Sequence, residues 1–287
     1  MVKEQTFETV DGYGMVDIGG APLAVGPVRS AKKVLKRTTE DLIRHATYAL
    51  AIHGIDGCGG AAALNHDRKA DDQTPIATFA AELTTWATST NFTGTAGLGL
   101  GAAEIGANLH GSAASANELI AASAAGCLAE ETSTVVIVSD GDEPALRALL
   151  GKNLLVTVEP DLATALTSGA DAAFVRSKTG ALDHATLTDV NVSRVVGLQP
   201  LTTTARGLAV AGRAGTVIVP DFVSAAGPYL AAAMDNSDPV AVAATTASSM
   251  AKLTNQGVAM FVRACELAEE HLGTWTSDLP FGRPLAP

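Results

Sequence analysis

Five short runs of mainly apolar residues, at similar intervals between residues 135 and 219, decide the fold of this chain. They read Val135-Val-Ile-Val138, Leu154-Leu-Val-Thr-Val158, Ala172-Ala-Phe-Val175, Arg194-Val-Val-Gly197 and Thr216-Val-Ile-Val219. Each run has the length of a strand and is apolar at consecutive rather than alternate positions, which is typical of strands buried on both faces. Helical patterns separate the runs. This alternation predicts an α/β fold with a doubly wound parallel sheet covered by helices on both faces.

The helices expected around these strands lie at Asn117–Glu130, Pro144–Leu150, Asp161–Thr167, Ala185–Asp189 and Thr202–Gly212. Outside this region, Val10–Ala24 predicts short strands broken by glycines. Apolar residues recur at spacings of three and four from Ser30 to His53, which predicts a helix that ends at a glycine-rich turn, Gly54–Gly60. Further helices are expected at Pro75–Thr90 and, as one or two elements, at Pro239–Gly273.

Composition and charge exclude several classes of protein. The chain has 287 residues, 47% of them apolar, which excludes a disordered protein. A net charge of −11 repels phosphate backbones and anionic lipid, so neither nucleic acid nor a membrane is an expected partner. The local cluster Lys32, Lys33, Lys36 and Arg37 predicts a solvated helix face rather than a binding patch.

The cysteines indicate a reducing compartment. Cys58, Cys127 and Cys265 are odd in number and far apart, with neither a metal-ligand spacing nor a disulfide framework. The N-terminus has no apolar signal core, and no apolar stretch approaches the roughly 20 residues that a membrane span needs. We therefore expect a cytoplasmic protein without a metal site.

Several motifs resemble those of a known family. Val219-Pro-Asp-Phe-Val-Ser-Ala-Ala-Gly227 is similar to the Pro-Asp-Phe/Tyr-x-x-Asn-Ala-Gly-Gly element of the Glu/Leu/Phe/Val amino-acid dehydrogenases. Ala46-Thr-Tyr-Ala49 and Gly54-Ile-Asp-Gly-Cys-Gly-Gly-Ala61 resemble that family's Met-Thr-x-Lys helix and Gly-Gly-Gly-Lys loop, and Pro27-Val-Arg29 lies where it has Gly-Gly-x-Arg. The matches run in order over about residues 10–235, with a pattern closest to the leucine and phenylalanine dehydrogenase branch.

The resemblance implies two domains. A substrate-type α/β domain would comprise residues 1–115, completed by the C-terminal helices in 236–287, and residues 116–235 would form a degenerate Rossmann-like dinucleotide domain. In the family, a cleft between the domains closes over the substrate. The residues that the resemblance places at this cleft are Arg29, Gly59, Gly60, Gln199 and Asp221. Arg29 could bind an anion there or form a surface ion pair.

The same alignment implies that the deamination chemistry is missing. Oxidative deamination needs a cation for the substrate carboxylate, a lysine that activates water and a carboxylate that moves protons. The family's two lysines, its aspartate and its asparagine fall on Ala49, Ala61, Ala96 and Ala225. A methyl group can do none of this, and the loss of one acid–base group alone commonly costs about 10²–10⁴ in rate.

The nucleotide site is predicted to be degenerate as well. A dinucleotide fold needs Gly-x-Gly-x-x-Gly after its first strand, so that backbone can approach the pyrophosphate. Here the turn Ser139–Ala145 has one glycine, Gly141, and three acidic residues that would repel a diphosphate. Glu159 could bond a ribose, or could be a solvated strand end. We expect no cofactor; NAD or NADP is the alternative.

The most economical interpretation is a catalytically degenerate relative that acts as a binding, regulatory or assembly subunit. It would form homo-oligomers, or hetero-oligomers with an active dehydrogenase, and could bind a small molecule. One alternative is an enzyme repurposed for another reaction, with Cys58 as nucleophile, His53 as base or Tyr48 in the cleft; an inert Cys58 and a packed Tyr48 are the competing interpretations. A divergent NAD(P)-dependent dehydrogenase is the second alternative.

Overall fold

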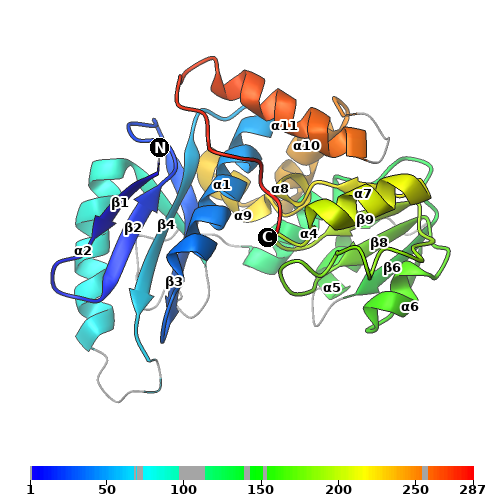
Figure 1. Ribbon diagram of the computed structural model, residues 1–287, viewed down its shortest axis with the longest axis horizontal. Coiled ribbons are helices and arrows are strands. Elements are labelled where there is room, and N and C mark those ends of the chain that lie inside the picture. The colour runs from blue at the N-terminus through cyan, green and yellow to red at the C-terminus, as the bar shows by residue number, and fades with distance from the viewer. Residues whose placement is uncertain are drawn as a thin grey trace. The chain divides into compact units, whose positions relative to one another are not determined.

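The computed structural model describes residues 2–67, 69, 74–96, 114–138, 143–150, 154–253 and 258–287. Its contacts divide the chain into two compact units (Figure 1). Unit 1 consists of Met1–Ala113, Pro228–Asn236 and Ala268–Pro284, and unit 2 of Ala114–Gly227, Ser237–Leu267 and Leu285–Pro287. Each unit has its own five-stranded sheet.

The sheet of unit 1 is mixed, and its strands lie in the order β1-β2-β4-β3-β5. β2 pairs with β1 and β4 antiparallel, whereas β3 pairs with β4 and β5 parallel. The strands are β1 (Lys3–Thr6), β2 (Gly12–Val16), β3 (Ala24–Ala31), β4 (Cys58–Asn65) and β5 (Phe92–Ala96).

Two helices, α1 (Lys36–Ile52) and α2 (Thr74–Thr90), pack on the sheet of unit 1. Ile43 of α1 joins the buried cluster formed by Met15 and Ala61, which are register partners in β2 and β4. Trp86 of α2 occupies the space over Gly14, where a Cβ would lie 2.3 Å from the indole. Neighbouring residues of a strand point to opposite faces, so α1 and α2 cover opposite faces of the sheet.

Two expectations for unit 1 are wrong. The helix expected from Ser30 begins only at Lys36, because Ala24–Ala31 is β3, a central strand paired on both sides. The glycine-rich turn expected at Gly54–Gly60 is shorter, because Cys58, Gly59 and Gly60 belong to β4. In both places glycine or proline stands inside a strand and looks like a turn signal in the sequence.

The sheet of unit 2 confirms the doubly wound parallel arrangement. All its strand pairs are parallel, in the order β10-β9-β8-β6-β7. The strands are β6 (Thr134–Val138), β7 (Leu155–Val158), β8 (Ala172–Val175), β9 (Arg194–Gly197) and β10 (Val217–Val219). The chain moves from β6 out to β7 and then returns to β8 on the other side of β6, so the topological switch point lies between β6 and β8.

Three helices, α5 (Glu143–Leu149), α6 (Leu162–Leu166) and α7 (Ala205–Ala214), connect β6 to β7, β7 to β8 and β9 to β10, and α4 (Ala116–Ala125) precedes β6. The connection from β8 to β9, described throughout, contains no helix. The short helix expected at Ala185–Asp189 is a turn instead, in which Asp183 accepts hydrogen bonds from the amides of Ala185 and Thr186.

The remaining helices are α8 (Asp221–Ser224), α9 (Gly227–Met234), α10 (Pro239–Met250) and α11 (Val258–Leu272). In unit 2, α10 packs closely on α4: a Cβ on Gly126 would lie 2.5 Å from the Ala243 carbonyl oxygen. Unit 2 thus includes Ser237–Leu267, which the sequence assigned to the substrate-type domain.

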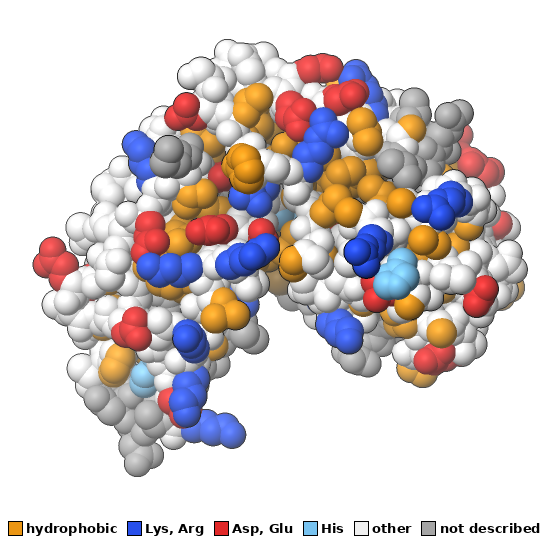
Figure 2. Space-filling model, in the orientation of Figure 1, with side chains coloured by type: hydrophobic (Ala, Val, Ile, Leu, Met, Phe, Trp, Pro, Cys, Tyr) orange, Lys and Arg blue, Asp and Glu red, His pale blue; other side chains and the backbone are white. Residues whose placement is uncertain are grey.

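None of the helices in the described part of the chain combines the length and apolarity of a bilayer span. On the face shown in Figure 2, acidic and basic side chains are interspersed among apolar ones.

Candidate functional site

The candidate site of unit 1 is built by the C-terminal half of α1, the turn that follows and β4. α1 ends at Ile52, with His53 as its half-buried C-cap and Gly54 in the left-handed conformation at φ +76°. The Gly54 and Ile55 amides donate to the last-turn carbonyls of Ala51 and Leu50. This tight ending returns the chain at once into the sheet. Ala49 and Ala61, which the motif resemblance aligns with the family's two lysines (the lysine-equivalent positions), therefore lie on neighbouring, packed elements of unit 1.

Ala49, the first lysine-equivalent position, is fully buried on α1. Its neighbour Tyr48 is buried too, and the Tyr48 hydroxyl donates to Glu269 Oε1 over 2.9 Å. Glu269 also accepts from Arg283, through Nε at 3.0 Å and Nη2 at 3.1 Å. The Arg283 hydrogen bond is the main cause that lowers the pKa of Glu269, so this carboxylate is charged at neutral pH. The Tyr48 hydroxyl therefore links α1 to the C-terminal end of α11, which agrees with a packed Tyr48 rather than one that contacts a ligand.

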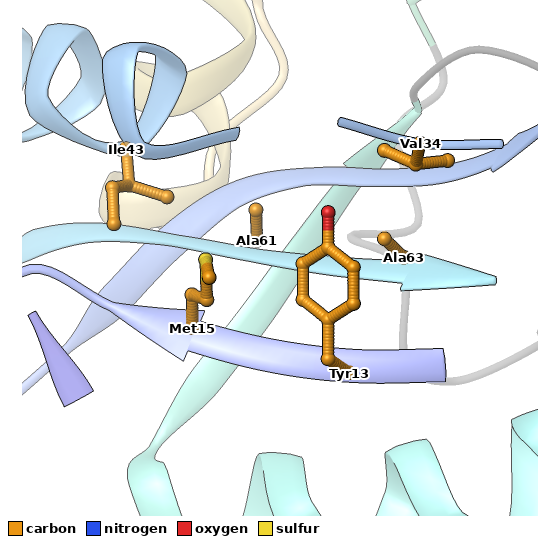
Figure 3. Close-up of a cluster of buried hydrophobic side chains, with 6 residues drawn as sticks. All are labelled: Tyr13, Met15, Val34, Ile43, Ala61 and Ala63. Atoms are coloured by element: carbon orange, nitrogen blue, oxygen red, sulfur yellow. The ribbon is translucent and has the colours of Figure 1, made fainter. Parts of the chain in front are cut away.

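Ala61, the second lysine-equivalent position, lies in an apolar cluster (Figure 3). Its methyl group is 0% exposed. The cluster consists of Tyr13, Met15, Val34, Ile43, Ala61 and Ala63, contributed by β2, the loop before α1, α1 itself and β4. Figure 3 shows Met15 and Tyr13 rising from β2 beside Ala61, with Ile43 above from α1. An ammonium group here would be surrounded by hydrocarbon and one phenol.

Gly59 and Gly60 serve packing in the structure. A Cβ on Gly59 would lie 1.7 Å from the Ile43 carbonyl oxygen, and one on Gly60 would lie 2.7 Å from the Phe92 ring. The first contact is with helix backbone, which cannot move aside. Only glycine therefore allows β4 to pass directly beneath α1.

A buried polar network beside these glycines was not foreseen from the sequence. Thr47 of α1 donates to Asp17 Oδ2 over 2.7 Å and accepts from the Gly59 amide at 2.8 Å. The Asp17 amide in turn donates to the Gly59 carbonyl. Burial raises the pKa of Asp17, which is 3% exposed. The only sequence signal was a charge inside the apolar stretch Met15–Ala24.

Cys58 does not lie in a turn, as expected, but in β4, where it is fully buried. Its thiol donates to the Ile18 carbonyl at 3.5 Å. Burial raises the pKa of Cys58 to about 12, so almost no thiolate exists at neutral pH. Since the thiolate is the nucleophilic form, Cys58 is chemically inert in this structure.

Two further unit 1 residues from the sequence prediction have backbone positions in the sheet. Arg29 is half-buried in β3 and pairs with Ala63; its charge is one of the smaller influences on Tyr13, whose pKa is raised mainly by burial. Ala96 ends β5, where its backbone pairs with Val28. Gly141, the proposed phosphate-turn glycine, lies outside the described residues.

In unit 2, Glu159 directly follows β7 and its Oε1 accepts the Asp161 amide at 2.9 Å. Asp161 then caps α6 by accepting the Thr164 amide at 2.8 Å. The Glu159 carboxylate is thereby held against its own turn.

The Pro-Asp-Phe element, residues 220–222, is hydrogen-bonded to the turn at the carboxyl edge of the unit 2 sheet. Asp221 is buried, and its Oδ2 accepts the Thr202 amide at 2.7 Å. The Gln199 carbonyl accepts the Thr202 hydroxyl at 2.7 Å, so the turn after β9 is held to the start of α8. Ala225, the asparagine-equivalent position, is buried at the end of α8. Among the described residues, no group of three or more His, Cys, Asp or Glu side chains could hold a metal ion.

Comparison with known proteins identifies the fold. No family model and no curated protein matches the sequence. The hetero-hexameric glutamate dehydrogenase from Thermus thermophilus, in its Leu-bound form, superposes with a TM-score of 0.74 at 15% identity, covering 96% of this chain and 89% of that chain. L-Tryptophan dehydrogenase from Nostoc punctiforme has a TM-score of 0.71 at 13% identity, with 96% of both chains covered. Plasmodium falciparum glutamate dehydrogenase 2 has a TM-score of 0.68 at 14% identity, covering 96% and 85%. The chain therefore has the fold of the Glu/Leu/Phe/Val amino-acid dehydrogenases, as its motifs indicated.

Proposed function

We propose that this chain is a non-catalytic relative of the amino-acid dehydrogenases, which acts as a binding, regulatory or assembly subunit. One observation carries the proposal: the two lysine-equivalent positions, Ala49 and Ala61, hold methyl groups with 0% exposure. A methyl group can neither pair with a substrate carboxylate nor activate water. With the aspartate and asparagine equivalents also alanine, at positions 96 and 225, no part of the deamination machinery is supplied by the family's own positions.

The described structure gives little support to the idea that Cys58, Tyr48 or His53 takes over the role of the missing catalytic groups. A nucleophile at position 58 would need a thiolate, and burial of the Cys58 thiol opposes one. A role in catalysis for Tyr48 would need its hydroxyl to contact a substrate, whereas this hydroxyl donates to Glu269. These contacts support the non-catalytic proposal over the alternative of a repurposed enzyme; His53, the third candidate residue of that alternative, is the C-cap of α1.

The proposal includes loss of nucleotide binding. The turn after β6 carries Asp140, Asp142 and Glu143 in sequence and only one glycine, so it would bring negative charge toward a diphosphate. Glu159, the remaining ribose candidate, is engaged in its own turn by the Asp161 amide. NAD and NADP are therefore not expected ligands, although a dehydrogenase fold makes a dinucleotide the natural one to test.

Assembly with other chains fits a subunit of this kind. The Thermus thermophilus protein is a hetero-hexameric glutamate dehydrogenase crystallised in a Leu-bound form. By analogy, we expect this chain to form oligomers with itself or with an active dehydrogenase in the cytoplasm, and a small amino-acid-like molecule to be its ligand. Nucleic acid is not expected as a partner because the net charge is −11.

Calorimetric titration of the purified protein with NAD and with NADP tests the proposal. We expect no binding heat and no nucleotide-dependent rise in melting temperature, because only a ligand that binds the native state in preference to the unfolded chain stabilises the fold. An active family member titrated in parallel controls for the quality of the nucleotide. Saturable binding of either nucleotide in the micromolar range would contradict the proposal.

A further inference from the structure

β7 is an edge strand of the unit 2 sheet, and it exposes apolar side chains to water. It lies at the end of the strand order, where it pairs with β6, and in the described part of the chain no strand pairs with its other side. Leu155 is 68% exposed and Val158 is 36% exposed. Natural edge strands are usually protected by proline, by charged side chains or by a covering segment. Residues 154–158 contain neither proline nor a charged residue, so this edge lacks the usual protection in its sequence.

The outer backbone groups of β7 are placed to pair with another strand. The amides of Leu155 and Glu159 donate to carbonyls of β6 and of the residue before it. The direction of hydrogen bonding alternates along a strand, so Val156 and Val158 direct their backbone groups away from β6. The Val156 carbonyl is contacted by the exposed Arg147 guanidinium at 3.5 Å, which is a long contact and leaves a second lone pair for a strand partner.

A groove lies beside β7 on the α6 side of the sheet, with a volume of about 260 Å³. Leu155 and Thr157 of β7 line it together with Thr164 of α6 and Ser168 of the loop that follows. Among the described residues that line this groove, only Glu159 is charged, and its carboxylate is held by its own turn. An exposed leucine and the wall of a groove thus lie two residues apart on the same face of one strand.

We propose that β7 pairs antiparallel with β7 of a second copy of this chain, about a twofold axis at Val156. In this register Val156 lies opposite itself, and Leu155 of each copy lies opposite Thr157 of the other. Opposite residues of an antiparallel pair point to the same face, so each Leu155 reaches the groove of the other copy. The outward backbone groups on both sides of the axis then form the ladder of a continuous sheet. One surface serves both copies, so the contact is isologous and closes as a dimer.

The charges around β7 favour a second copy as the occupant. In the sequence, Lys152 precedes the strand, and Glu159 and Asp161 follow it. Antiparallel pairing brings the start of one strand beside the end of the other, so the basic start of each copy meets the acidic end of its partner. The paired residues themselves are uncharged, so the net charge of −11 is not concentrated at the contact. The pairing names a surface for the self-assembly expected above and rests on that part of the proposed function.

Sedimentation velocity tests the contact with charge variants. Leu155→Lys should raise the dissociation constant of self-association at least about tenfold, because it places one ammonium group from each copy at an apolar contact. Val240→Lys is the matched control and should change nothing, because Val240 is also 68% exposed in unit 2 but lies on α10. Val156→Pro should weaken association as well, because it removes an amide that points away from β6 and leaves the β6 ladder intact.

Disulfide trapping tests the register. A mixture of Leu155→Cys protein and Thr157→Cys protein should give a 155–157 disulfide between copies, located by mass spectrometry, in higher yield than any disulfide of either variant alone. Opposite residues of such a pair have Cα atoms about 4.5 Å apart, which a disulfide spans. The native cysteines, Cys58, Cys127 and Cys265, are buried and do not compete.

The outcomes separate this contact from the proposed function. Self-association that Leu155→Lys leaves unchanged, or that Val240→Lys weakens equally, would overturn the β7 contact alone, as would a mixture that gives no 155–157 disulfide. A wild-type protein that stays monomeric at high concentration would overturn the contact and the expected self-assembly together. The loss of nucleotide binding is measured independently by calorimetry.

Discussion

Replacement of Ala61 by lysine introduces the residue that the motif resemblance places here in the family, and the structure predicts that the protein cannot accept it. Ala61 is 0% exposed and is surrounded by Tyr13, Met15 and Ile43. A lysine buried among such groups has its pKa lowered by up to about 3–5 units. At about 1.36 kcal/mol per unit this costs about 4–5 kcal/mol at neutral pH, because an amine whose pKa falls below 7 loses its proton instead of staying charged. Crowding of the extra side chain adds about 1–3 kcal/mol. Since domains of this size are stable by about 5–15 kcal/mol, most of the native state would be lost.

Urea unfolding followed by circular dichroism measures this cost. Ala77→Lys is the matched control, because Ala77 lies on the exposed face of α2; its free energy of unfolding should stay within about 0.5 kcal/mol of wild type. The cost of Ala61→Lys should fall as the pH rises above the lowered lysine pKa, because the unfolded chain then binds more protons than the native state. An Ala61→Lys protein as stable as Ala77→Lys at neutral pH would refute the reasoning, since it would mean that the position opens onto water.

Three further outcomes follow from the buried groups of unit 1. Burial raises the pKa of Asp17, so the native state holds the Asp17 proton more tightly than the unfolded chain does, and the free energy of unfolding should fall as the pH rises from about 4 through the folded pKa. Asp17→Asn should remove this pH dependence from melting curves taken between about pH 4 and 8. Cys58, with its pKa raised to about 12, should resist iodoacetamide in the native protein and react fully in urea, and rapid native labelling at Cys58, located by mass spectrometry, would contradict its burial. Tyr48→Phe should lower the free energy of unfolding by about 0.5–1.5 kcal/mol through loss of the hydrogen bond to Glu269, and an unchanged value would mean that this bond contributes nothing.

Unit 2 could be predicted from the sequence because its strands are buried on both faces. Such strands appear as short, continuous apolar runs, and those at Ala172–Val175 and Arg194–Gly197 match the observed elements residue for residue. The parallel order then follows from the long crossover connections between the runs. Unit 1 was harder, because β3 contains Gly26-Pro27 and β4 begins Cys58-Gly59-Gly60, where small residues permit close backbone approach. The local propensities of those residues predict turns, but packing in the folded unit places them in strands.

The sequence indicates a candidate site only through family motifs, which predict that Ala49 and Ala61 replace the family's lysines. The contacts that determine what the neighbouring side chains do are non-local. Tyr48 and Glu269 are 221 residues apart, and the partners Asp17 and Thr47 are 30 apart, so no local pattern reveals either hydrogen bond. The burial that makes Cys58 inert likewise depends on how β4 packs under α1, which the spacing of glycines did not disclose.

Oxidation of amino acids is the activity that we propose this protein has lost. The measurement is NAD(P)H formation at 340 nm with high concentrations of purified protein, a panel of L-amino acids and either nucleotide, compared with heat-denatured protein. We expect no amino-acid-dependent signal, because alanines at positions 49, 61, 96 and 225 provide no acid, base or carboxylate-binding group. Reduction of either nucleotide that depends on one amino acid and scales with native protein concentration would contradict the account.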